Sequence, residues 1–249
     1  MMTPEQRFVF DVQGFLVVPS VLSPKRMQKM LADMEEHGIR EPENDPSKSR
    51  FGGFLSWGEE WRALIDEPQI LPILSELLGP RFRLDHAYGM AMRAEGKGGG
   101  EGLHHQAGMF HQGCFYTTHG NLMHNGLVVV SYALTDIEPG MGGFVCIPGS
   151  HKASFPVPQN WYGLEENPLV RQIPQKAGDV LIFTESLTHG TAPWRDTQHE
   201  RRSVLMKFCP HYMQWSKSTM SSEIDGLSER QKLILQGPYV WSRAVVEEQ

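Results

Sequence analysis

The chain has few cysteines, and this limits the kinds of site that it can form. Only three of its 249 residues are cysteine. They are scattered along the chain as Cys114, Cys146 and Cys209, and none of them has the CxxC spacing of a zinc cluster or a redox site. The small, odd number disfavours a disulfide framework. We therefore expect a reducing compartment, the cytoplasm.

Long apolar runs and a surplus of basic residues are also missing. No stretch approaches the ~20 apolar residues of a membrane-spanning helix. The opening MMTPEQRFVFDVQGF has no basic segment followed by an apolar run, so no signal peptide is expected. The 23 Lys and Arg residues are outnumbered by 29 Asp and Glu residues, which gives a net charge of −6. We predict neither nucleic acid nor a membrane as partner.

Helical patterns lie at both ends of the chain. Hydrophobic residues make up 40% and charged residues 21%, which is typical of a globular protein. Thr3 and Ser23 are placed as N-caps of two helices, and a third helix is predicted over 68–79. Residues 41–60 are polar and rich in turn formers, which predicts a loop or lid, and a helix is expected again near 228–236.

The middle of the chain is typical of β-structure. Segments rich in β-branched and aromatic residues are separated by Gly, Pro and Asp. They are RFRLDHAYGMAMRA (81–94), NGLVVVSYALTD (125–136), GFVCIPG (143–149), DVLIFTES (179–186) and RRSVLMKFCP (201–210). We predict one domain over 1–249, mainly β: a helical part to about 80, a sandwich or jelly-roll core over about 81–210, and a helical tail.

Histidines cluster where a metal could bind. The chain has 11 of them, and the adjacent His104 and His105 in GLHHQAGMF and His189 in FTESLTHGTAP lie near strand ends. Imidazole is the commonest neutral metal ligand at physiological pH. Arg201 and Ser203 share one face of a predicted strand, and a guanidinium beside a hydroxyl suits a dicarboxylate. Taken alone, Arg201 and the neighbouring Arg202 are better explained as solvated charges at a sheet edge.

Three segments together resemble one enzyme family. They are NGLVVVSYALTDIEPGMGGFVCIPGSHKASFP (125–156), AGDVLIFTESLTHGTAPW (177–194) and RRSVLMKF (201–208). They look like the phytanoyl-CoA dioxygenase family, and GFLVVPSVLSPKRM near the start is similar to the family's usual opening. The resemblance implies a double-stranded β-helix, a jelly-roll variant, that uses iron(II) and 2-oxoglutarate as cofactors.

The resemblance also implies roles for individual residues. His189 matches the family's distal metal ligand, and Thr191 matches a hydroxyl that contacts 2-oxoglutarate. Arg201 matches the arginine that binds the far carboxylate of 2-oxoglutarate, with Arg202 as the register alternative. The family's proximal ligand would be His105 or His104.

The proximal motif departs from the family pattern. The family has His-x-Asp, whereas this chain has HHQAG. If His105 is the ligand, Ala107 stands where the aspartate should be. If His104 is the ligand, Gln106 stands there instead. Neither register supplies a carboxylate.

Several outcomes follow from this departure. HQA is similar to the motif of iron/2-oxoglutarate halogenases, in which chloride binds iron at the vacant position. A Gln106 amide oxygen is a second possible ligand, and a carboxylate from elsewhere, such as Glu101 or Asp136, is a third. The last outcome is an inactive protein that binds a small molecule.

We predict an enzyme, a 2-oxoglutarate-dependent dioxygenase that hydroxylates a small organic substrate and releases succinate. The alternatives are a halogenase that uses the vacant position at Ala107, with chloride as a further cofactor, and the inactive binding protein. Asn125 is a candidate for contact with the cosubstrate, and Arg93 and Tyr116 are candidates for contact with the substrate.

Overall fold

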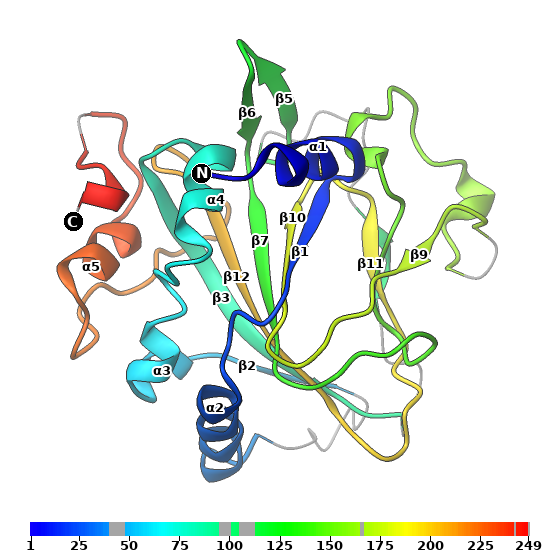
Figure 1. Cartoon of the computed structure of the whole chain (residues 1–249), viewed down its shortest axis with the longest axis horizontal. Helices are drawn as coiled ribbons and strands as arrows, with labels where there is room; N and C mark the ends of the chain where they lie inside the picture. The colour runs from blue at the N-terminus through cyan, green and yellow to red at the C-terminus, as the bar shows by residue number, and fades with distance from the viewer. Residues whose placement is uncertain (40–47, 95–100, 105–112, 165–166, 242, 249) are drawn as a thin grey trace.

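Two β-sheets face each other at the centre of the molecule. The computed structural model describes residues 1–249 apart from 40–47, 95–100, 105–112, 165–166, 242 and 249. In Figure 1 the larger sheet runs through the middle of the view, the smaller sheet lies to its right, and helices lie to its left. The region between the two sheets is where the site described below is formed.

The larger sheet has six antiparallel strands in the order β1-β10-β7-β12-β3-β2. In chain order they are β1 (Phe15–Val18), β2 (Lys48–Phe51), β3 (Phe82–Met92), β7 (Val128–Ala133), β10 (Val180–Thr184) and β12 (Arg201–Pro210). The pairing of β12 with β3 runs from Arg201 opposite Met92 to Pro210 opposite Phe82. This register decides which side chains of β12 face the smaller sheet.

The smaller sheet has four antiparallel strands in the order β4-β11-β8-β9. They are β4 (Glu101–His104), β8 (Gly143–Cys146), β9 (Arg171–Gln172) and β11 (His189–Ala192). A separate hairpin of β5 (Tyr116–His119) and β6 (Leu122–Asn125) extends beyond both sheets at the top of Figure 1. Its turn residues Gly120 and Asn121 have φ values of 56° and 64°, as a two-residue hairpin turn requires.

Helices cover the outer face of the larger sheet. They are α1 (Pro4–Gln13), α2 (Pro24–Glu36), α3 (Glu59–Arg62), α4 (Leu71–Leu78) and α5 (Glu229–Leu235). Short 3-10 turns occur elsewhere as η1 (Phe54–Ser56), η2 (Ser150–Lys152), η3 (Gln159–Trp161) and η4 (Val246–Glu248). The side chains of Thr3 and Ser23 accept hydrogen bonds from backbone N–H groups in the first turns of α1 and α2. The two predicted N-caps are therefore confirmed. No helix in the described part of the chain is long and apolar enough to cross a membrane.

Strand β7 shows how the sequence builds both layers. All six of its residues, VVVSYA, are buried, because alternate side chains point to opposite faces of the sheet and both faces are covered. Val128, Val130 and Tyr132 pack in a cluster with helical side chains on the outer face. Val129 packs with Phe144 and Phe183 between the sheets.

The predicted jelly-roll core with helical buttresses is confirmed, and one detail of the prediction is wrong. The N-terminal part contributes strand β1, within the apolar run 14–22 that favours a strand, and strand β2 to the larger sheet. Residues 41–60, predicted as a loop or lid, contain β2, η1 and the start of α3 where the structure describes them. Their aromatic residues explain the difference, because Phe51 stacks on Trp57 at 5.5 Å between ring centroids and Trp57 packs edge-on against Trp61 at 4.9 Å.

Candidate active site

A pocket of about 200 Å³ lies between the two sheets. Alternate side chains of a strand point to the same face of a sheet, and the residues of the larger sheet that line the pocket show this alternation. Strand β3 contributes His86, Tyr88 and Met90, and β12 contributes Arg201, Leu205 and Lys207. The remaining lining residues are Arg50, His104, Ser131, Phe144, Phe183, Glu185, His189, Thr191 and Trp215.

Two histidines face each other across neighbouring strands of the smaller sheet. His104 on β4 lies directly opposite His189 on β11, and their ring centroids are 4.3 Å apart. The Nδ1 atom of His189 lies 2.6 Å from the backbone oxygen of Leu187, and that of His104 lies 3.0 Å from the oxygen of Gly102. A proton on each Nδ1 satisfies these contacts and puts the lone pair on Nε2, the arrangement of histidines that bind metal.

A buried carboxylate completes a cluster with these histidines. Glu185 is 2% exposed, and its Oε1 lies 3.9 Å from Nε2 of His189. Ligand atoms of His104, Glu185 and His189 all lie within 4.8 Å of one another, which is close enough for one metal ion to be shared after small side-chain movements. Glu185 Oε1 also accepts a hydrogen bond of 2.9 Å from Nζ of Lys207. The neighbouring Glu185 charge helps to keep the pKa of Lys207 raised although burial of its amine acts in the opposite direction.

Arg201 is a buried cation that lines the same pocket. Its residue is 3% exposed, and burial lowers the pKa of the guanidinium to about 10. Nη1 contacts the sulfur of Met92 at 3.2 Å, and Nε has no hydrogen-bond partner among the described residues. Gly143 (φ 84°) on β8 packs against it, because a Cβ there would lie 3.4 Å from Nε of Arg201. A buried cation with an unsatisfied donor favours an anionic ligand.

The structure places the remaining predicted cosubstrate contacts in different regions. Thr191 follows His189 on β11 and lines the pocket. Arg202 points away from it and forms ion pairs with Glu35 and Glu200. Asn125 lies outside the pocket lining, because its amide donates to the backbone oxygen of Leu77 at 2.9 Å and joins β6 to α4.

The two predicted substrate contacts also lie elsewhere. Arg93 forms an ion pair with Glu200 and lines two other surface pockets. The hydroxyl of Tyr116 donates to the carboxylate of Asp11 on α1, and its ring packs against His151. Both side chains therefore serve local packing and charge pairing in the structure.

Part of the proximal motif lies outside the described residues. His105, Gln106 and Ala107 belong to that part. Of the two histidines predicted as proximal ligand, the structure therefore describes His104 and not His105. Of the two carboxylates considered as substitutes, Asp136 accepts a hydrogen bond of 2.7 Å from the backbone N–H of Ala177. The Glu101 side chain is not among those described.

The sequence analysis missed Glu185, although a signal was present. In DVLIFTES the alternation that places Leu181 and Phe183 between the sheets continues to position 185. An acidic residue in that register is expected to face the same interior. His86, Tyr88 and Lys207 gave no such signal, because their common pocket depends on the long-range pairing of β3 and β12.

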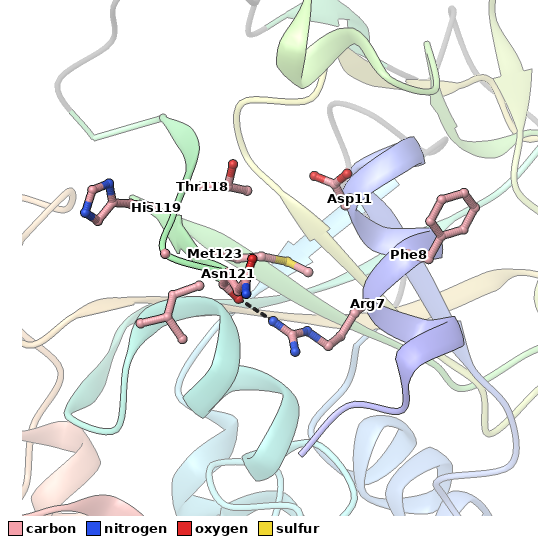
Figure 2. Close-up of a pocket in the computed structure, with 9 residues that line it drawn as sticks. Arg7, Phe8, Asp11, Thr118, His119, Asn121 and Met123 are labelled. Atoms are coloured by element: carbon pink, nitrogen blue, oxygen red, sulfur yellow. Dashed lines mark hydrogen bonds between the residues drawn. The ribbon is translucent and has the colours of Figure 1, made fainter.

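A second and larger pocket lies outside the sheets, between α1 and the β5–β6 hairpin. Its volume is about 610 Å³. Figure 2 shows Arg7 and Asp11 on the side of α1 toward the hairpin residues from Thr118 to Met123, with the Arg7 guanidinium donating to the backbone oxygen of Asn121; Phe8 also lines the pocket. Most of these residues are exposed, and His119 is the one histidine in the lining. This pocket therefore lacks the grouped ligands of the inner one.

The inner pocket brings together two facing histidines and a buried arginine between the sheets of a jelly-roll core. The family model described as phytanoyl-CoA dioxygenase (PhyH) matches residues 10–203, most of the chain. The chain belongs to this family and is an oxygenase-type enzyme. No curated protein sequence is significantly similar to it.

Solved structures share the same fold. HygX from Streptomyces hygroscopicus, with nickel and 2-oxoglutarate bound, superposes with a TM-score of 0.77 at 22% identity over 100% of this chain and 99% of that one. The epimerase SnoN, in complex with Fe3+, alpha ketoglutarate and nogalamycin RO, gives 0.63 at 17% identity over 96% of each chain. The carbocyclase SnoK from nogalamycin biosynthesis gives 0.62 at 17% identity over 84% of this chain and 85% of that one. At these identities the likeness shows the fold of iron/2-oxoglutarate-dependent enzymes.

Proposed function

We propose that this protein is an iron(II)- and 2-oxoglutarate-dependent dioxygenase that hydroxylates a small organic molecule. The observation that carries the proposal is the shared pocket of His104, His189, Thr191 and Arg201. Two neutral nitrogen ligands lie at one end, and a buried guanidinium without a carboxylate partner among the described residues lies in the same cavity. A dicarboxylate that bound the metal at one end would reach the guanidinium with the other.

The residues present suit both groups. The Nδ1 contacts of His104 and His189 suit a proton on Nδ1 and a metal on Nε2 of each ring, which is the role of second contacts to metal-binding histidines. Arg201 has an unsatisfied Nε and offers a planar fork that matches a carboxylate. When bound, the metal and 2-oxoglutarate supply the oxidising chemistry, in which 2-oxoglutarate is decarboxylated to succinate.

The protein's own part in the reaction is to bind, orient and exclude water. Phe144 and Phe183 pack around His189, with ring centroids 5.7 and 4.8 Å from its imidazole. They give the metal end of the pocket an apolar wall. Tyr88 and Trp215 line the other part of the cavity, and the guanidinium of Arg50 lies 4.2 Å above the Tyr88 ring. We propose that this aromatic and cationic part holds the substrate.

The similar structures support a small organic substrate. HygX is known with hygromycin B bound, and SnoN with nogalamycin RO. These molecules are ligands of those proteins, and we carry over to this chain only the class, a small molecule that enters the pocket. The three cysteines are free and buried, which supports the proposal that the enzyme works in the reducing cytoplasm.

The test is anaerobic addition of iron(II) and 2-oxoglutarate to the metal-free protein, followed by visible absorption. We expect a metal-to-ligand charge-transfer band in chloride-free buffer, and succinate release once oxygen and a substrate are supplied. A band that required chloride would favour the halogenase interpretation. No band with or without chloride would contradict the proposal and favour an inactive binding protein.

A further inference from the structure

The proposed metal site contains a carboxylate that the proximal motif does not provide. We propose that Glu185 is the third protein ligand of the metal, in place of the aspartate that HHQAG lacks. This inference rests on the proposed function, because it concerns the same metal. The ligand then comes from the turn between β10 and β11, and the vacant position is filled.

The chain holds Glu185 and His189 in a fixed relation. Glu185 follows β10 directly, and its backbone N–H donates to the oxygen of Leu127 at 2.9 Å. A short turn leads to His189, closed by the N–H of Leu187 donating to the oxygen of Thr184 at 3.0 Å. The N–H of Thr188 donates to the hydroxyl of Ser150 at 2.8 Å. The carboxylate and the imidazole therefore rise from one hydrogen-bonded turn.

The cluster has the composition of a two-histidine, one-carboxylate site. Such sites bind iron(II) on one face and leave positions for a cosubstrate and oxygen. Glu185 and His189 are almost fully buried, and His104 is half-buried. Nε2 of His189 lies 3.9 Å from Oε1 of Glu185, and a ring nitrogen of His104 lies within 4.8 Å of the ligand atoms of both residues. All three metal-binding side chains belong to described residues. The site therefore requires no ligand from residues 105–108 of HHQAG.

The ion pair with Lys207 is compatible with this role. A carboxylate has two oxygens and about four lone pairs, so Glu185 can bind a metal through one lone pair while Lys207 donates to another. Metal-binding carboxylates are commonly held by such a second contact. In the metal-free protein Lys207 compensates the buried charge of Glu185, which would otherwise be costly. The competing explanation is that the ion pair is the whole role of Glu185.

Metal binding separates the two explanations without any turnover. Mn(II) is titrated into the metal-free protein in chloride-free buffer, and the electron paramagnetic resonance signal of free Mn(II) reports the dissociation constant. For Glu185→Gln we expect the constant to rise by at least about 10-fold, because even an outer contact to a ligand is worth 10- to 100-fold. The amide still accepts a hydrogen bond from Lys207, so the pocket stays filled.

Glu67→Gln is the matched control. Glu67 is also a buried glutamate, 7% exposed, paired with Nη1 of Arg26 at 2.7 Å, and it does not line the pocket. We expect this variant to bind Mn(II) as the wild type does. Saturating Mn(II) should also raise the melting temperature of the wild type and of Glu67→Gln, and have little effect on Glu185→Gln. The melting curve of metal-free Glu185→Gln checks that it is folded.

The outcomes distinguish this inference from the proposed function. If Glu185→Gln bound Mn(II) like the wild type while His189→Ala did not, Glu185 would be only the partner of Lys207, and the proposed function would stand. If the wild type and His189→Ala bound Mn(II) equally, both proposals would fail.

Discussion

The protein has a large outer pocket lined mostly by exposed residues and a small inner pocket that contains buried charged groups. The outer pocket beside α1 has about three times the volume of the inner one, about 610 against about 200 Å³. Its polar residues, such as Thr118, His119 and Asn121, are exposed and solvated. The inner pocket contains Glu185, His189 and Arg201, all of them buried.

The burial of the polar groups in the inner pocket indicates which of the two pockets binds a ligand. A charged or hydrogen-bonding group loses its hydration when it is buried, and this is unfavourable unless a partner replaces the water. The buried guanidinium of Arg201 keeps an unsatisfied Nε in the described structure. A solvated side chain in the outer pocket carries no comparable implication. The smaller pocket is therefore the one whose residues imply a ligand.

The largest effect is expected from the histidines of the two pockets. His189→Ala removes a metal ligand, so we expect Mn(II) binding to weaken by more than about 100-fold, beyond the loss seen for an outer contact. His119→Ala, the same change in the outer pocket, should leave the dissociation constant unchanged. Isothermal titration calorimetry measures both. Equal affinities for the two variants would contradict the assignment of the inner pocket.

The next effect is expected from the arginines. Arg201→Ala should weaken the binding of 2-oxoglutarate to the Mn(II)-loaded protein by about 2 to 5 kcal/mol, at least about 30-fold, because a buried charged contact to a carboxylate is lost. Arg7→Ala in the outer pocket is the control and should have no effect. Arg202→Ala should also have none, since its guanidinium pairs with Glu35 and Glu200. A loss of affinity in Arg202→Ala instead would move the role to that residue.

Several of these assignments were accessible from the sequence. The resemblance pointed to His189, Thr191 and Arg201, and the structure gathers all three in one pocket. The choice between Arg201 and Arg202 needed the register of β12 against β3, since a shift of one residue exchanges the two faces of a strand. Local sequence does not determine that register.

Other residues show why local patterns were insufficient. Arg93 and Asn125 lie at the end and at the start of predicted strands. Their partners, Glu200 and Leu77, are distant in sequence. Glu185 was missed because Glu101 and Asp136 were considered as replacement carboxylates without following the alternation of faces along β10.

A smaller effect, on stability, is expected near the outer pocket. His151 packs against the Tyr116 ring with 4.7 Å between centroids, and its Nε2 lies 3.1 Å from the backbone oxygen of Asp11. Burial lowers the pKa of His151 from 6.5 to about 4. Between these values the unfolded chain binds a proton that the folded chain does not. The stability is therefore complete above about pH 6.5 and is lost as the pH falls toward 4.

Urea unfolding of the metal-free protein at several pH values measures this loss. At pH 5 we expect the wild type to lose about 2 kcal/mol relative to pH 7.5 through this histidine, on the order of 1.36 kcal/mol for each pH unit below 6.5. His151→Gln keeps a donor for Asp11 and removes the titration, so its stability should fall less over the same range. Other titrating groups contribute equally to both proteins and cancel in the difference. Parallel curves would show that His151 has no such role.

The smallest effect is expected at the wall of the outer pocket itself. Phe8 is 69% exposed and buries little apolar area, so Phe8→Ser should change the free energy of unfolding by less than about 0.5 kcal/mol. Binding of Mn(II), 2-oxoglutarate and substrate should stay as in the wild type, because the change lies outside the sheets (Figure 2). A weaker affinity for substrate in this variant would show that the outer pocket also binds it. That result would contradict the interpretation that only the inner pocket binds the substrate, because the exposed outer pocket would also take part in recognition.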